Sequence, residues 1–348
     1  MIGVTTAQAY AAWARKNHVE MLTDELPEGA KLHWIGRRRE DRVILYFHGA
    51  YTFFFLQLQL RCSEHGGPWA VQAEDLFFQL GRTTLRYLRP FKRIARMPSE
   101  SPSSTTVRSP DKHEVDDPPI DRSPTALIPE YPFPTQLRQA TAAVQHLLDK
   151  GMSPSNIIIA GDSAGGNLAL QFACLLLHPH PSLPLPPRPD TRGADAGSSS
   201  SSSQQPFGGL LLISPAVRFG TDAPSYVRNS ARDLMPLSAY QLFSDTVQLS
   251  ISPALRYYIE PRLAPRGWWT GLGRVFLRVL VTAGEYEMPL DHIEASAAAI
   301  SEEVRDTTVF VLPGGVHEDF MNAFASGEGG RGDDYKLVVS WLSETLNL

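Results

Sequence analysis

The segment Gly161-Asp162-Ser163-Ala164-Gly165-Gly166 decides how we interpret this 348-residue chain. It follows an apolar run, 156–160, that has the length of a buried strand, and it opens an apolar stretch, 164–177, that has the length of a helix. A sharp strand-to-helix turn of the form Gly-x-Ser-x-Gly holds a serine hydroxyl clear of the backbone, where it can act as a nucleophile. The sequence therefore predicts Ser163 as a nucleophile at such a turn.

The composition of this turn has a physical reason. Gly161 and Gly165 leave space where a Cβ would clash with the neighbouring strand or helix, so that Ser163 can be held in an unfavourable backbone conformation. The helix that starts here offers free N–H groups and a partial positive charge, and the N–H of Ala164 is the expected oxyanion donor. Asp162 is expected to be structural at this site. The alternative is a glycine-rich turn with a helix-capping serine.

Strand and helix signals alternate along the rest of the chain. Short apolar runs predict strands at 43–47, 156–160, 209–213, 275–283 and 308–312. Helical spacing of apolar residues predicts helices at 136–149, 164–177, 289–304 and 334–346. This order predicts an α/β fold with a mostly parallel central sheet covered by helices on both faces, and sites at the carboxyl ends of its strands.

We predict one domain over residues 1–348 with two insertions that pack poorly. Residues 96–125 are rich in serine, proline and charge, and 178–206 run from prolines into six consecutive serines. Such segments bury too little apolar surface to offset their ordering entropy, so both are expected to be loops or disordered. Residues 218–273 interrupt the strand–helix rhythm with a helical stretch, 238–249, and proline-rich turns. They are interpreted as a cap or lid, or else as an ordinary long connection.

The end of the first predicted strand is a candidate oxyanion loop. Phe47-His48-Gly49-Ala50-Tyr51 carries small residues whose N–H groups can approach a nucleophile, so Gly49 and Ala50 are candidate donors. His48 is interpreted as a structural residue that holds this loop. A simple turn at the strand end is the competing interpretation.

A nucleophilic serine needs a histidine base and a carboxylate that orients it. Only His292 and His317 lie well beyond Ser163 and after predicted strands. His292 falls within a predicted helix, on what would be a solvated face, whereas His317 follows the glycines after the last predicted strand. Glu285, Glu287 and Asp291 compete as the acid.

These motifs resemble those of the hormone-sensitive-lipase-like branch of α/β hydrolases, which includes fungal esterases and acetyl hydrolases. The resemblance rests on the turn 161–166, on His48-Gly49 upstream of it, and on Pro129-Glu130-Tyr131-Pro132-Phe133-Pro134, and it covers about residues 40 to 345. The family's oxyanion motif is His-Gly-Gly-Gly followed by an aromatic residue. Here His48-Gly49-Ala50-Tyr51 either replaces two glycines or lacks one glycine position. The segment before Pro129 is polar, so one strand of the family sheet is expected to be short or missing.

The resemblance implies an α/β-hydrolase fold and a Ser163–His317–Glu287 triad without metal or cofactor. The family places its base before the last helix, where His317 lies, and a second acid four residues after the catalytic one, a spacing that Glu287 and Asp291 match. Glu285 is the second choice for the acid. Asp291 is interpreted as a charge at a helix start.

The expected reaction is hydrolysis of a carboxylic ester with a hydrophobic acyl part of small to medium size, or of an acetyl ester. Aromatic residues are candidates for the pocket wall: Tyr51, Phe53, Phe54, Phe55, Tyr240, Phe243, Trp268 and Trp269. Core packing is the alternative role for several of them. An amidase or acyltransferase on the same triad, or an inactive ligand-binding relative with an altered oxyanion loop, stay open.

The charge composition indicates which classes of binding partner to expect. A net charge of −5 and 20% charged residues favour neither nucleic acid nor an anionic membrane surface, so a small-molecule ester is the expected partner. No signal peptide and no apolar run long enough to span a bilayer is recognised, which leads us to expect a soluble cytoplasmic protein, with peripheral membrane attachment left open. Nothing in the sequence addresses the oligomeric state.

Overall fold

A computed structural model describes residues 6–35, 41–49, 58–60, 132–187, 205–248, 251–326 and 332–347. Several sequence predictions lie outside these ranges. They are the insertion 96–125, most of the insertion 178–206, the segment 125–131, and the residues Ala50, Tyr51, Phe53, Phe54 and Phe55.

The centre of the fold is a parallel sheet. Its order is β3-β5-β6-β7-β8, with bounds Val43–Phe47, Ile157–Asp162, Gly209–Ile213, Val279–Gly284 and Thr307–Leu312. Every neighbouring pair of strands in this sheet is parallel. All residues of β3, β5, β6 and β7 are buried, which explains their unbroken runs of branched apolar side chains. The predicted mostly parallel sheet is confirmed.

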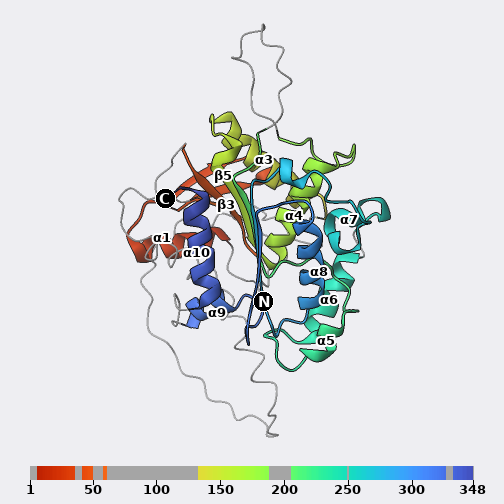
Figure 1. Cartoon of the computed structure of the whole chain (residues 1–348). Helices are drawn as coiled ribbons and strands as arrows, with labels where there is room; N and C mark the ends of the chain where they lie inside the picture. Colours follow the sequence, from red (N-terminus) through yellow and green to blue (C-terminus); the bar gives the residue numbers. More distant parts are fainter. Residues whose placement is uncertain are drawn as a thin grey trace, which may run out of the picture.

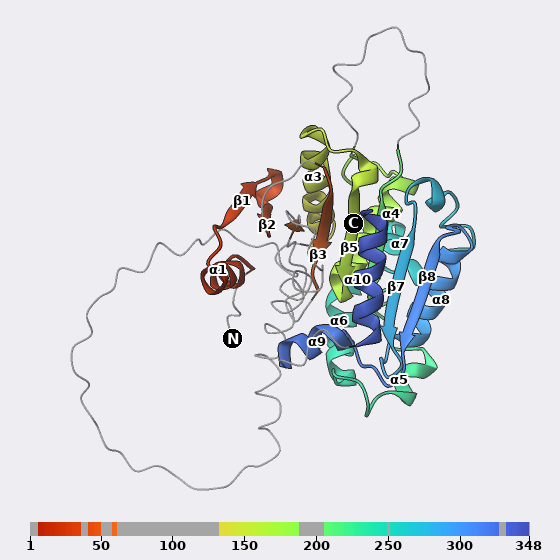
Figure 2. The same ribbon diagram turned by 60° about the vertical axis from the view of Figure 1, so that its left-hand side comes forward.

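Helices cover both faces of the sheet (Figures 1 and 2). Alternate strand residues such as Val43 and Leu45 face a core that includes α3 (Thr135–Asp149), α4 (Ser163–Leu177) and α8 (Leu290–Ser301). The intervening residues face α9 (Asp319–Ser326) and α10 (Asp333–Thr345). Figure 1 shows the sheet between α10 on one side and α4 and α8 on the other. The period-two alternation of side chains along each strand supplies both cores.

The amino-terminal part forms a small separate sheet that the sequence did not predict. Helix α1 (Thr6–Asn17) precedes β1 (Leu22–Glu25) and β2 (Lys31–Trp34), which pair antiparallel, and β4 (Leu58–Leu60) adds in parallel to β2. The buried hydroxyl of Tyr10 donates to the carbonyl oxygen of Trp34 over 2.6 Å and ties α1 to β2. These short strands alternate weakly in polarity, which explains why pattern alone did not reveal them.

The connection between β6 and β7 holds the predicted cap region. It contains α5 (Pro224–Arg228), α6 (Leu237–Gln248) and α7 (Arg256–Ile259), with one-turn 3-10 helices at Pro253–Leu255, Pro261–Leu263 and Leu272–Arg274. Two more such turns lie at Pro27–Gly29 and Pro154–Asn156. The predicted helix 238–249 is confirmed as α6. Whether this region serves as a lid stays a prediction.

The strand predicted at 275–283 was placed too early. The ladder of β7 begins at Val279, and Phe276 makes only an isolated bridge to Phe207. Phe276 is fully buried, so this part of the apolar run packs the core without joining the sheet. A run of apolar residues does not distinguish a segment that is only buried from one that pairs in a sheet.

Among the helices in the described ranges, none combines the length and apolarity needed to cross a membrane.

Candidate active site

The turn at Ser163 has the strained geometry expected from its glycines. Ser163 adopts φ +47°, a left-handed conformation that is uncommon for residues other than glycine. A Cβ at Gly165 would lie 1.9 Å from the carbonyl oxygen of Phe47, and one at Gly161 would lie 2.4 Å from that of Gly165. Strand β3, strand β5 and helix α4 therefore meet at backbone contact, and this contact holds Ser163 at the carboxyl end of β5.

Three side chains from three loops form one hydrogen-bonded chain. The His317 ring, which follows β8, has Nδ1 2.8 Å from Oε2 of Glu287 and Nε2 3.1 Å from Oγ of Ser163. Glu287 follows β7 and is fully buried, and His317 is 6% exposed. With Nδ1–H donating to Glu287, Nε2 is free to accept the hydroxyl proton of Ser163. The structure thus brings together Ser163, Glu287 and His317.

The carboxylate of Glu287 is held by more than the histidine. Its Oε1 accepts hydrogen bonds from Oγ of Ser214 and from the N–H of Gly284, both over 2.6 Å. The Asn229 side chain donates to the backbone carbonyl oxygen of Glu287 over 2.7 Å. These donors hold the buried carboxylate of Glu287 in one orientation.

The competing candidates lie elsewhere. The exposed Glu285 accepts the N–H of Gly314, and Asp291 accepts the N–H of Ser225 and pairs with Arg228. Asp291 lies in the first turn of α8, as expected of a charge at a helix start. His292 is buried in α8 with Nε2 3.4 Å from Asp222, which corrects the expectation of a solvated face.

The electrostatics of His317 suit a base paired with an acid. Burial by itself would lower the pKa of His317, but the charge of Glu287 and its hydrogen bond outweigh burial. Glu318 and Asp233 add smaller contributions in the same direction, so the pKa of His317 lies above 6.5. The neighbouring carboxylates therefore stabilise the imidazolium that forms when Ser163 loses its proton.

One side of the expected oxyanion site is described. A Cβ at Gly49 would lie 2.7 Å from Cβ of Ser163, so the Gly49 backbone closely approaches the nucleophile. Ala164 is the second residue of α4, in the turn whose N–H groups have no partner within the helix. The His48 ring is hydrogen-bonded to the carbonyl oxygen of Gly49 over 2.7 Å, an arrangement that holds this loop, and burial lowers the pKa of His48. The buried Asp162 accepts the hydroxyl of Tyr46 over 2.7 Å.

The two tryptophans assigned to the pocket wall lie far from Ser163. Trp268 stacks on His178 at the C-terminal end of α4 and donates its indole N–H to Sγ of Cys174. Ser163 begins this 15-residue helix, and 1.5 Å per residue puts its two ends about 20 Å apart. Trp269 is buried in the same core. The structure therefore does not bring Trp268 or Trp269 to the site, and aromatic character alone could not distinguish core from pocket.

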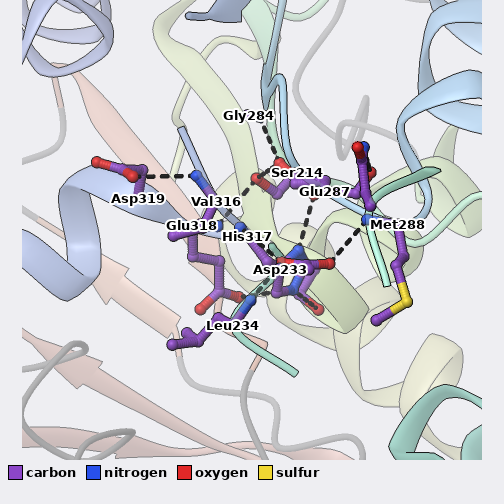
Figure 3. Close-up of polar contacts among 12 residues, drawn as sticks. Ser214, Asp233, Leu234, Gly284, Glu287, Met288, Val316, His317, Glu318 and Asp319 are labelled. Carbon is purple, nitrogen blue, oxygen red and sulfur yellow. Dashed lines mark hydrogen bonds and ion pairs between the residues drawn. The ribbon is translucent and has the colours of Figure 1, made fainter. Parts of the chain in front are cut away.

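Tyr240 does reach the site, together with Asp233, which sequence reasoning missed. The Tyr240 ring meets the His317 ring edge to face at 6.4 Å, and its hydroxyl donates to Asp233. Asp233 also accepts hydrogen bonds from the backbone N–H groups of His317 and Met288. One carboxylate therefore joins the loop after β8 that carries His317 (the base loop), the loop after β7 that carries Glu287 (the acid loop) and the β6–β7 connection (Figure 3). No motif marks Asp233 in the sequence, because its partners are backbone groups 55 and 84 residues away.

No group of three or more His, Cys, Asp or Glu side chains in the described part of the chain is placed to hold a metal ion.

Comparison with known proteins places this site in a family. The profile described as alpha/beta hydrolase fold matches residues 126–321, more than half of the chain. Lipase 2 of Moraxella sp. is 44% identical over 57 residues, which are 15% of this chain and 13% of that protein. An acetyl-hydrolase of Streptomyces hygroscopicus is 48% identical over 42 residues, 12% of this chain and 14% of that protein. These matches span less than a fifth of the relatives' length.

The fold agrees over a longer stretch. A crystal structure titled hormone-sensitive lipase from a metagenome library superimposes with a TM-score of 0.56, covering 97% of this chain and 91% of that one at 20% identity. Such low identity supports the fold alone. The family profile over residues 126–321 makes the assignment: the chain belongs to the alpha/beta hydrolase fold family.

Proposed function

We propose that this protein hydrolyses carboxylic esters, with Ser163 as nucleophile, His317 as base and Glu287 as the orienting acid. The observation that carries the proposal is the unbroken chain from Glu287 through His317 to Ser163, with separations of 2.8 and 3.1 Å. A chain in which a carboxylate orients an imidazole that contacts a hydroxyl is the arrangement that activates serine for acyl transfer.

The geometry supports a two-step reaction. Oγ of Ser163 attacks the ester carbonyl carbon while Nε2 of His317 takes its proton. The imidazolium then protonates the alcohol as the ester C–O bond breaks, which leaves an acyl group on Ser163. Water, deprotonated by His317, then attacks the acyl group. The bond between the acyl carbon and Oγ breaks, the imidazolium returns its proton to Oγ of Ser163, and the carboxylic acid is released. Glu287 keeps the imidazole in one tautomer throughout, because Ser214 and Gly284 fix its other oxygen.

Backbone N–H groups would stabilise the oxyanion of both tetrahedral intermediates. Ala164 and Gly49 are the proposed donors in the described part of the site, and Ala50, which lies outside it, is the third. Donors fixed in this way before the reaction are worth about 10²- to 10³-fold in rate each.

The proposed substrates are acetyl esters or esters with a small to medium hydrophobic acyl group. Support comes from the names of similar proteins, an acetyl-hydrolase and a lipase.

The test combines a covalent probe with turnover. We expect a fluorescent fluorophosphonate to label the wild-type chain and not Ser163→Ala, and p-nitrophenyl acetate and butyrate to be hydrolysed by the wild type alone. Ser230→Ala is the matched control, because Ser230 is an exposed serine bonded only to a nearby carbonyl oxygen. This control should label and turn over like the wild type.

Failure of a folded wild type to label would refute the proposed nucleophile and favour a ligand-binding role. Labelling without ester turnover, together with cleavage of an anilide, would move the substrate class from esters to amides.

A further inference from the structure

A second acidic side chain lies against the reacting nitrogen of His317. Oε1 of Glu318 is 3.8 Å from Nε2, the nitrogen that contacts Ser163, whereas Glu287 lies at Nδ1 (Figure 3). Glu318 is 5% exposed, so this carboxyl group is almost removed from water. The imidazole ring is therefore flanked by a carboxyl group at each nitrogen.

The position of Glu318 is fixed by its backbone. Its φ is +54°, and its N–H donates to Oγ of Ser214, the hydroxyl that also contacts Glu287. The amide of Asn322 donates to the carbonyl oxygens of His317 and Glu318 over 2.9 Å and ties both residues to α9. A left-handed conformation at a residue with a side chain is unfavourable, so these contacts hold Glu318 where it is.

Glu318 has an unusual set of neighbours. Its Oε1 is buried and has no hydrogen-bond partner among the described residues, and its carboxyl group lies beside that of Asp162. Two buried carboxyl groups in contact favour a shared proton over two charges. Burial and then Asp162 raise the pKa of Glu318 well above 4.5, with His317 acting in the opposite direction.

The groups that face this cluster come from every strand end around it. They are Asp162 at the end of β5, Tyr46 in β3, His48 directly after β3, Glu287 after β7, Asp233 from the β6–β7 connection, and His317 itself.

We propose that the Glu318 carboxyl group is a second proton-binding group of the site, which faces Nε2 of His317 and sets, through its charge, the pH at which this imidazole becomes neutral. When ionised, Glu318 favours the imidazolium. When Glu318 takes up a proton, it no longer does so, and His317 can stay neutral and accept the proton of Ser163. Glu318 is thus a positioning residue that acts through the base, and the proposal rests on the proposed function.

The test is a titration of His317 that does not depend on activity. In protein with isotope-labelled histidine, the ring resonances of His317, assigned by their loss in His317→Gln, are followed against pH by NMR. We expect two coupled steps in the wild type and one step in Glu318→Gln, with the midpoint lower by about one pH unit, a tenfold change in proton affinity. The acid limb of kcat/KM should move in the same direction.

Two further variants make the result specific. Glu318→Asp keeps the charge and should restore a two-step titration, although the side chain is shorter. Glu294→Gln removes an exposed carboxylate on α8 and should leave the curve unchanged. A His317 curve with the same single midpoint in wild type and Glu318→Gln would overturn the proposal. Absence of esterase activity in the wild type would instead refute the proposed function. The NMR titration of His317 would still test the effect of Glu318.

Discussion

At the scale of single residues, the site depends on how many hydrogen bonds each buried carboxylate oxygen of Glu287 accepts. Glu287 accepts hydrogen bonds at both oxygens, from His317 on one side and from Ser214 and Gly284 on the other. Only a carboxylate can accept at both positions, because an amide has one oxygen and one donor group. This requirement distinguishes Glu287 from the nearby Glu285, which is exposed.

Glu287→Gln should therefore lower kcat by about 10³- to 10⁴-fold with a smaller change in KM. The amide cannot accept from Ser214 and Gly284 and also from His317, so the imidazole loses its orientation or its tautomer. Steady-state hydrolysis of p-nitrophenyl butyrate measures the effect. Glu285→Gln is the control and should stay within about threefold of the wild type. The opposite ranking of the two variants would move the acid to Glu285.

At the scale of one element, the tight turn at Ser163 limits which side chains positions 165 and 166 can carry. The close approach of Gly165 to Phe47 joins α4 to β3, and a Cβ added at Gly166 would lie 2.9 Å from Cβ of Pro215. The first contact is with backbone and cannot give way without moving a strand, whereas the second is with a side-chain carbon.

Gly165→Ala should destabilise the fold by about 1–3 kcal/mol or more, the usual result of forcing a methyl group into packed structure. The urea midpoint of unfolding, followed by circular dichroism, measures this loss. Gly166→Ala is the graded control and should cost less. Equal midpoints for wild type and Gly165→Ala would show that β3 and α4 are not in backbone contact.

Asp233 is one of the side chains that couple the β6–β7 connection to the site. Asp233 accepts from the backbone of His317, Leu234 and Met288 and from the hydroxyl of Tyr240. It thereby ties the loops that carry His317 and Glu287, which also hydrogen-bond to each other directly, to the β6–β7 connection.

Asp233→Asn should lower kcat about tenfold and the free energy of unfolding by about 1–3 kcal/mol. The amide nitrogen of the asparagine cannot accept the hydrogen bonds that an Asp233 oxygen accepts, so buried donors are left without a partner. Since the charge of Asp233 also raises the pKa of His317, the acid limb of kcat/KM should shift to lower pH. Asp245→Asn, on the exposed side of α6, is the matched control. Wild-type kinetics and stability in Asp233→Asn would exclude this coupling.

For the whole molecule, the site and the aromatic cluster around Trp268 lie at opposite ends of α4. Trp268 contacts His178, Tyr257 and Tyr258, and no described contact joins it to the triad. This arrangement assigns Trp268 to the support of the fold and leaves Tyr240 as the aromatic residue beside the base.

Trp268→Ala should therefore lower the urea midpoint, with a loss of about 2–4 kcal/mol for a half-buried aromatic side chain, and leave KM for p-nitrophenyl butyrate within about twofold. Tyr240→Ala should instead reduce kcat/KM, because Tyr240 contacts both His317 and Asp233. A tenfold rise of KM in Trp268→Ala would return this residue to the pocket.

The sequence by itself determined the sheet, the turn and Ser163, because these depend on local patterns. Unbroken apolar runs marked β3, β5 and β6, and the spacing of the glycines around Ser163 marked the turn, although the close contact of Gly165 is with the distant Phe47. His317 and Glu287 were selected through family resemblance, since order along the chain left other candidates open.

Only the tertiary structure decided which distant groups meet. It brought Asp233 to His317 and Asp162 to Glu318, placed Trp268 at the far end of α4, and started β7 at Val279. These outcomes depend on the crossing of loops at the carboxyl edge of a parallel sheet, where residues more than 80 positions apart share one hydrogen bond. A sequence pattern does not contain the spatial separation of two such residues, because that separation is set by how strands and helices pack.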